Sequence, residues 1–236
     1  CILAKSPKPS EQGWSRTKEK KAIIFDLHGT LLDTLSDIAD SMNEVLARHG
    51  LPVHGYDAYR TMIGAVLDVL ARRAVPEDRR DDGTVSSVVA DMRKEYDRRW
   101  SFTSRPYPGV PEMLTLLAGR GIPFSVLSNK LDSFAKQMVS ALLSGWNFFE
   151  VRGLVQGLPR KPDPHMALEM ADSLGLFAEQ VIFVGDSDID METAVRAGMA
   201  PVGVLWGYQT PERLTSSGAS ALLSSPRELL GLFVRL

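Results

Sequence analysis

Short apolar runs alternate along the chain with stretches in which apolar residues recur every three or four positions. The runs lie at about 22–25, 124–127, 151–155, 181–184, 201–205 and 221–223. The stretches with helical spacing lie at about 110–119, 131–143, 164–174, 188–197 and 226–234. Continuous apolar runs are typical of strands that are buried on both faces. The alternation therefore predicts an α/β fold, with a Rossmann-like parallel sheet flanked by helices.

The segment 34–105 interrupts this alternation. Helical spacing runs from Leu35 to His49, and further helices are expected at roughly 57–63, 65–74 and 84–100, with no strand among them. Residues 1–21 are polar and rich in Pro and Ser, so we expect them to be disordered. The predicted organisation is an N-terminal extension 1–21, an α/β core formed by 22–33 and 106–236, and an inserted helical cap 34–105.

Composition narrows the class of protein. With 236 residues, the chain is long enough for one large domain that carries a small insertion. A net charge of −2 gives no reason to expect binding to nucleic acid or to an anionic membrane. No apolar run approaches the roughly 18 residues of a membrane span. Cys1 is the single cysteine, which excludes an internal disulfide and favours a reducing, cytoplasmic location.

A carboxylate stands at the end of the first predicted strand. Asp26 directly follows the apolar run 22–25 and opens the string Asp26-Leu27-His28-Gly29-Thr30. Burying a carboxylate is costly unless it is paired or bound to a metal. Open α/β sheets place their ligands just beyond the carboxyl ends of the strands. Asp26 is therefore a candidate for chemistry.

Three further polar clusters follow later strands. Ser128 and Asn129, at a strand-to-helix turn, can cradle phosphate oxygens, although they are also common as a plain helix cap. Lys161 lies between prolines in a loop and can supply fixed positive charge, unless it is simply solvated. Asp186 and Asp190 are one helical turn apart, which favours Mg²⁺ binding or an acidic helix start.

These four clusters together resemble the four motifs of the haloacid dehalogenase (HAD) superfamily, in the same order and over about residues 22–234. The strings 106–110, 127–130 and 203–208 further resemble the phosphoglycolate phosphatase branch. The resemblance implies a HAD-like core with a cap. It also implies a phosphatase that acts on a small phosphorylated metabolite, with 2-phosphoglycolate as the expected substrate, as a monomer or homodimer.

The resemblance also implies roles for individual residues. Asp26 would attack the substrate phosphorus to form an aspartyl-phosphate. The cofactor Mg²⁺ would be held by Asp26, the backbone carbonyl of His28, Asp186 and Asp190. The substrate and its phosphate would be held by Thr30, Ser128, Asn129, Lys161 and, from the cap, Arg60.

Position 28 departs from the family pattern Asp-x-Asp-Gly-Thr, in which the second acid protonates the leaving group and later activates water. Histidine can act as a general acid or base, but its ring is bulkier, and a nearby metal favours its neutral form. His28 leaves three outcomes open: a weakened hydrolase, a competent histidine variant, or a nearly inactive phosphate- and metal-binding protein. A metal-free haloacid dehalogenase is a further alternative, against which Asp186 and Asp190 argue.

Overall fold

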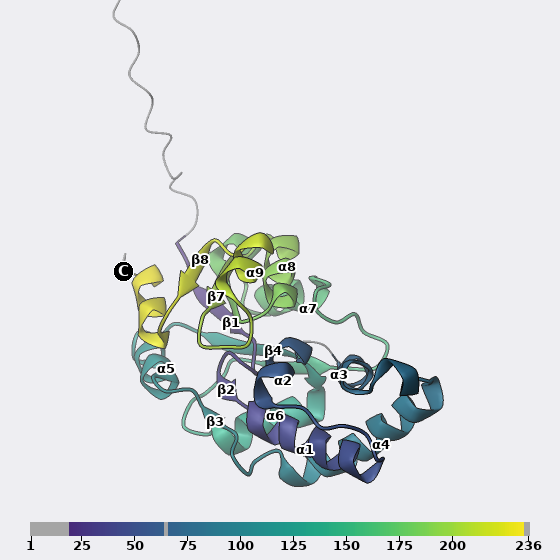
Figure 1. Cartoon of the computed structure of the whole chain (residues 1–236). Helices are drawn as coiled ribbons and strands as arrows, with labels where there is room; N and C mark the ends of the chain where they lie inside the picture. The colour runs from purple at the N-terminus through teal and green to yellow at the C-terminus, as the bar shows by residue number, and fades with distance from the viewer. Residues whose placement is uncertain (1–18, 64–65, 234–236) are drawn as a thin grey trace, which may run out of the picture.

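Six strands form one parallel sheet in the order β5-β4-β1-β6-β7-β8 (Figure 1). The computed structural model describes residues 19–63 and 66–233, so most of the predicted extension 1–21 lies outside the described residues. The parallel α/β fold predicted from the sequence is confirmed. The strands are Ala22–Phe25 (β1), Phe124–Leu131 (β4), Val151–Leu154 (β5), Val181–Gly185 (β6), Ala200–Val204 (β7) and Ala221–Leu223 (β8).

Helices cover both faces of this sheet because its strands are apolar on both sides. In β1, Ile23 and Phe25 belong to one buried cluster, and Ala22 and Ile24 belong to the other. Helices α5 and α6 contribute to the first cluster, and α7 and α8 contribute to the second. Their bounds are Val110–Gly119 (α5), Asp132–Leu142 (α6), His165–Ser173 (α7) and Asp188–Ala197 (α8).

The end of the described chain differs from the prediction. An α-helix is expected at 226–234, but Pro226–Phe233 (η3) forms a 3₁₀ helix that packs against α5. The tighter helix suits a short terminal piece that begins at a proline. A short helix, Pro211–Ser216 (α9), which the apolar pattern did not indicate, precedes β8.

A second, two-stranded sheet marks where the chain leaves and rejoins the main sheet. Leu32–Asp33 (β2) pairs antiparallel with Arg105–Pro106 (β3). Between them lie helices Leu35–Arg48 (α1), Tyr56–Met62 (α2), Leu67–Ala74 (α3) and Asp82–Arg99 (α4), and the 3₁₀ turn Glu77–Arg79 (η1).

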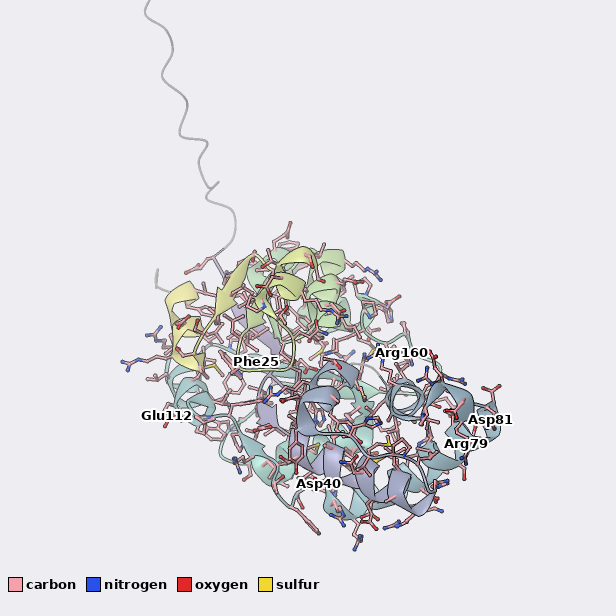
Figure 2. The ribbon with its side chains drawn as sticks, in the orientation of Figure 1. Phe25, Asp40, Arg79, Asp81, Glu112 and Arg160 are labelled. Carbon is pink, nitrogen blue, oxygen red and sulfur yellow. The ribbon has the colours of Figure 1, made fainter. Side chains whose placement is uncertain are left out.

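Helices α1 and α4 pack against each other, and α3 packs against α4. Figure 2 shows Arg79 and Asp81 at the outer edge of this helical region and Phe25 inside the molecule. A functional division of the chain into cap and core stays a prediction. Among the described residues, no helix is long and apolar enough to cross a membrane.

Candidate active site

The carboxyl ends of neighbouring strands bring the predicted polar clusters together. Strand β1 lies between β4 and β6 and pairs in parallel with both. The backbone N–H of Asp26 donates to the carbonyl of Val184 in β6 at 2.8 Å, which extends this pairing by one residue. Asp26 and Asp186 directly follow β1 and β6, and Ser128 lies in β4 just beyond its last residue paired with β1, so the three residues meet at one edge of the sheet.

Three buried carboxylates converge at this edge. One oxygen atom from each of Asp26, Asp186 and Asp190 lies within 4.8 Å of the others. Nζ of Lys161 lies 2.6 Å from Oδ1 of Asp26 and 2.7 Å from Oδ1 of Asp190. We call these four residues the acid cluster. When its three acids are ionised, one ammonium leaves two negative charges uncompensated. This charge and an all-oxygen donor set fit a hard divalent cation.

The pKa values of the acid cluster reflect this shortage of positive charge. Burial, together with the charges of Asp26 and Asp190, raises the pKa of Asp186 well above its ordinary value. Burial raises the pKa of Asp26 to about 6, although Lys161 pulls it down. Burial lowers the pKa of Lys161, but Asp190 and Asp26 outweigh this effect and raise it. A bound cation would favour the ionised form of all three acids.

Two hydrogen bonds hold the Asp186 carboxylate, and two glycines leave room for it. The hydroxyl of Thr30 donates to Oδ1 of Asp186 at 3.2 Å, and the backbone N–H of Tyr208 donates to Oδ2 at 2.9 Å. A Cβ atom on Gly29 or on Gly207 would lie 2.2 Å from an atom of the Asp186 side chain. Gly29 also has a φ of +85°, which favours glycine. Both glycines therefore make room for this carboxylate.

Asp190 is held in the first turn of α8. The backbone N–H and hydroxyl of Ser187 donate to Oδ2 of Asp190 at 3.1 and 2.5 Å. The neighbouring acid Asp188 turns away from the cluster, because its carboxylate accepts from Arg213 at 2.7 Å and from Gln209 at 3.0 Å. Two acids of this motif therefore face the site, and one does not.

His28 has a fixed orientation beside the acid cluster. Its Nδ1 lies 2.9 Å from Oγ1 of Thr34, which lies 3.1 Å from the hydroxyl of Tyr208. Its Nε2 is buried and has no hydrogen-bond partner among the described residues. Burial lowers the pKa of His28 well below its ordinary value, and the charges of Lys130 and Lys161 lower it further. All three effects favour the neutral form of the ring.

A cavity of about 600 Å³ adjoins the acid cluster, a size that is usual for small-molecule sites. Helices α3 and α4 contribute apolar side chains to its wall, such as Leu67, Leu70 and Met92, together with the charged side chains Asp68, Arg93, Lys94 and Asp97. The predicted site residues that line it are Asp26, His28, Ser128, Asn129, Lys161, Asp186 and Asp190.

Two predicted site residues, Thr30 and Arg60, do not line this cavity. Thr30 is buried, and its hydroxyl is directed to Asp186. The guanidinium group of Arg60 donates to the carbonyl of Gly207 at 3.3 Å and lies 3.9 Å from Asp57. The structure therefore gives no support for a direct substrate contact by either side chain.

Three residues of the site were not assigned a role from the sequence. Thr34 and Tyr208 orient His28, and Lys130 lines the cavity. Lys130 and Tyr208 stand in strings that carry the family resemblance, which is a signal that could have found them. Thr34 has no such signal, because its contact with His28 depends on the turn between β1 and α1.

Comparison with known proteins agrees with the fold and indicates the family. A model of the haloacid dehalogenase-like hydrolase family matches residues 23–204. The phosphoglycolate phosphatase of Aquifex aeolicus (strain VF5) is 33% identical over 213 residues, which cover 90% of this chain and 96% of that protein. The phosphoglycolate phosphatase of Yersinia pseudotuberculosis serotype I (strain IP32953) is 31% identical over 217 residues, covering 90% and 93%.

A solved structure shows the same likeness. A protein from Haemophilus somnus 129PT, described as a predicted phosphoglycolate phosphatase, superposes with a TM-score of 0.80 at 29% identity. The match covers 92% of this chain and 99% of that one. The chain belongs to the haloacid dehalogenase-like hydrolase family. Within that family it stands in the phosphoglycolate phosphatase-like branch, and the prediction of a phosphatase is confirmed at this level.

Proposed function

We propose that the chain is a Mg²⁺-dependent phosphatase that hydrolyses a small phosphomonoester, with 2-phosphoglycolate as the leading substrate, through an aspartyl-phosphate on Asp26. The acid cluster that lines the cavity is the observation that carries this proposal. The names of the curated relatives support the choice of substrate.

Asp26 is the nucleophile in this proposal. Its carboxylate attacks the phosphorus, and the bond between phosphorus and the leaving alcohol oxygen breaks as the new P–O bond forms. Lys161 holds Oδ1 of Asp26 at 2.6 Å and so orients the carboxylate. A Mg²⁺ ion held by Asp26, Asp186, Asp190 and the carbonyl of His28 would offset the negative charge of the acids and of the phosphoryl oxygens.

The last residues of β4 supply donors for the phosphoryl oxygens. Oγ of Ser128 accepts from the backbone N–H of Lys130 at 3.2 Å, so its own hydrogen remains free to donate to a phosphoryl oxygen. Nδ2 of Asn129 donates to the backbone carbonyl of Lys161 at 3.1 Å and thereby ties this strand end to the loop that carries the lysine. Ser128 is therefore the direct donor, whereas Asn129 positions Lys161.

His28 is better suited to activating the attacking water than to protonating the leaving alcohol. A neutral imidazole can accept a proton from the water that attacks the aspartyl-phosphate, and the unpartnered Nε2 is the atom available for this step. Donating a proton to the leaving alcohol is harder, because the neutral ring would become an anion. We therefore expect this enzyme to prefer esters whose alcohol leaves readily without protonation.

A second candidate is a phosphate- and metal-binding protein with negligible turnover, which the histidine at position 28 favours. A panel of small phosphate esters, with and without Mg²⁺, separates the two functions. The enzyme is expected to release inorganic phosphate only with Mg²⁺, fastest from 2-phosphoglycolate among the alkyl esters. Phosphate binding measured by calorimetry, together with no release from any ester, would support the second candidate.

A further inference from the structure

Lys130 is a cation that faces the cavity without a carboxylate partner. It is the next-to-last residue of β4 and lines the same cavity as Asp26 and His28. The other basic residues that line this cavity are Arg93, Lys94 and Lys161, and each has a carboxylate within 4.0 Å. Among the described residues, none places a carboxylate that close to Lys130.

The aromatic neighbours of Lys130 do not compensate for the missing carboxylate. Its Nζ lies 4.1 Å from the centre of the Tyr96 ring and 5.8 Å from the centre of the Phe134 ring. Such cation–π contacts recover less free energy than a desolvated ammonium loses on leaving water. Burial lowers the pKa of Lys130 to about 8, which reflects the same loss of solvation.

The hydroxyl of Tyr96 adds a second unused polar group. Tyr96 belongs to α4, lines the cavity and is 7% exposed, and its oxygen has no hydrogen-bond partner among the described residues. Buried polar groups are rarely left without a partner, and those at binding sites are commonly completed by a ligand. A cation without a carboxylate partner therefore lies against the ring of a tyrosine whose hydroxyl has no partner, and both residues line the cavity that the acid cluster also lines.

We propose that Lys130, backed by Tyr96, binds a second acidic group of the substrate, a carboxylate or phosphoryl group on the leaving alcohol. This inference rests on the proposed function and deepens it, because it defines the substrate class as phosphomonoesters of acidic alcohols. It also gives Lys130 the charge-recognition role expected of Arg60, whose guanidinium is held outside the cavity.

The test measures binding in the Asp26→Asn background, where turnover cannot obscure affinity. Calorimetry compares 2-phosphoglycolate, ethylene glycol bisphosphate and ethyl phosphate, the last of which has no second acid. Lys130→Met is expected to weaken binding of at least one of the two diacids about 10- to 100-fold, the usual effect of losing a hydrogen bond to a charged group. Binding of ethyl phosphate should change less than about threefold.

The control variant is Lys94→Met, which removes an exposed lysine of the same cavity that already pairs with Asp91. It should leave all three affinities within about twofold. Lys130→Arg keeps the charge and should retain the preference for a diacid, while Tyr96→Phe should weaken that preference by up to about tenfold. The diacid that loses more affinity in Lys130→Met identifies the acidic group.

Equal weakening of ethyl phosphate and both diacids would overturn the proposal, because Lys130 would then act on the shared phosphoryl group or on folding. Unchanged affinities, or no diacid binding at all, would overturn it as well. Failure of the proposed function has a different signature. The wild-type chain would then release no phosphate, whereas the Asp26→Asn background would still show binding that depends on Lys130.

Discussion

Two charge clusters of this protein have opposite compositions. In the acid cluster at the sheet edge, three buried carboxylates share the single ammonium of Lys161. In the helical region, one buried carboxylate, that of Glu95 in α4, is shared by three guanidinium groups. These groups belong to Arg48, Arg98 and Arg99, at 2.7, 2.6 and 2.5 Å.

The pKa values of the carboxyl groups differ between the two clusters in the direction that the surrounding charges predict. Burial raises the pKa of Asp26 to about 6 despite Lys161. Burial also acts to raise the pKa of Glu95, but hydrogen bonds from its three arginines outweigh it and lower the pKa to about 2. A carboxylate saturated with cations stabilises the fold, whereas acids that are short of cations hold a site open for a ligand. The contrast separates a structural cluster from a candidate ligand site.

The largest effect is expected from Asp26→Asn. Removing the nucleophile should lower kcat by at least about 1,000-fold. In chelator, the same change relieves repulsion within the acid cluster, so the free energy of unfolding should rise by about 1 kcal/mol. Phosphate release and urea denaturation measure the two effects.

Asp188→Asn is the matched control for this variant, because Asp188 belongs to the same motif as Asp186 but faces Arg213. Its kcat should stay within about twofold of the wild-type value. Near-normal turnover by Asp26→Asn would contradict the assignment of Asp26 as the nucleophile. So would a loss of kcat in Asp188→Asn as large as the loss expected of Asp26→Asn.

The next largest effect is expected from His28→Asp. An acid at this position can protonate the leaving alcohol, so kcat for an alkyl phosphate should rise about 100-fold. An aryl phosphate, whose leaving group needs no proton, should gain less than about fivefold. Steady-state rates for ethyl phosphate and phenyl phosphate measure the difference, and equal gains for both would contradict the role given to His28.

The smallest effect is expected from Glu95→Gln, which alters the structural cluster and leaves the acid cluster intact. Losing the charged partner of three arginines should lower the free energy of unfolding by about 1–2 kcal/mol at pH 7. The value of kcat should stay within about twofold. Glu44→Gln, a change in an exposed partner of Arg48, is the control and should cost less than about 0.5 kcal/mol.

The effect of Glu95→Gln on stability should depend on pH in a definite direction. The pKa of Glu95 is lowered in the folded protein, so its contribution is fully present above the ordinary glutamate pKa near 4.5. That contribution is lost as the pH falls toward about 2. The stability difference between wild type and Glu95→Gln should therefore shrink over this range, and a difference that grows at low pH would contradict the account.

Much of the fold could be predicted because its signals are local. The apolar run 22–25 and the runs that follow it mark strands whatever surrounds them, and all six predicted strands of the sheet are present. The ribbon formed by β2 and β3 could not be predicted, because two residues per strand are too few to show a period.

The site could be predicted only in part, because side-chain direction depends on tertiary contacts. Asp26, Asp186 and Lys161 follow from the motifs, and the structure brings them together. Arg60 is a candidate substrate contact in the sequence; its guanidinium donates to the carbonyl of Gly207 and does not line the cavity, so a substrate contact by Arg60 stays a prediction. The cation of the cavity that lacks a carboxylate partner is Lys130, and its contact with Tyr96 joins two elements that are distant in sequence.

The most direct test of the central claim is the initial rate of phosphate release from 2-phosphoglycolate as Mg²⁺ is added to the chelator-treated chain. If the acid cluster is a divalent-cation site that serves Asp26, release should be absent in chelator and should rise to saturation with Mg²⁺. It should stay absent in Asp26→Asn at every Mg²⁺ concentration. Release that does not depend on Mg²⁺, or that persists in Asp26→Asn, would contradict the account.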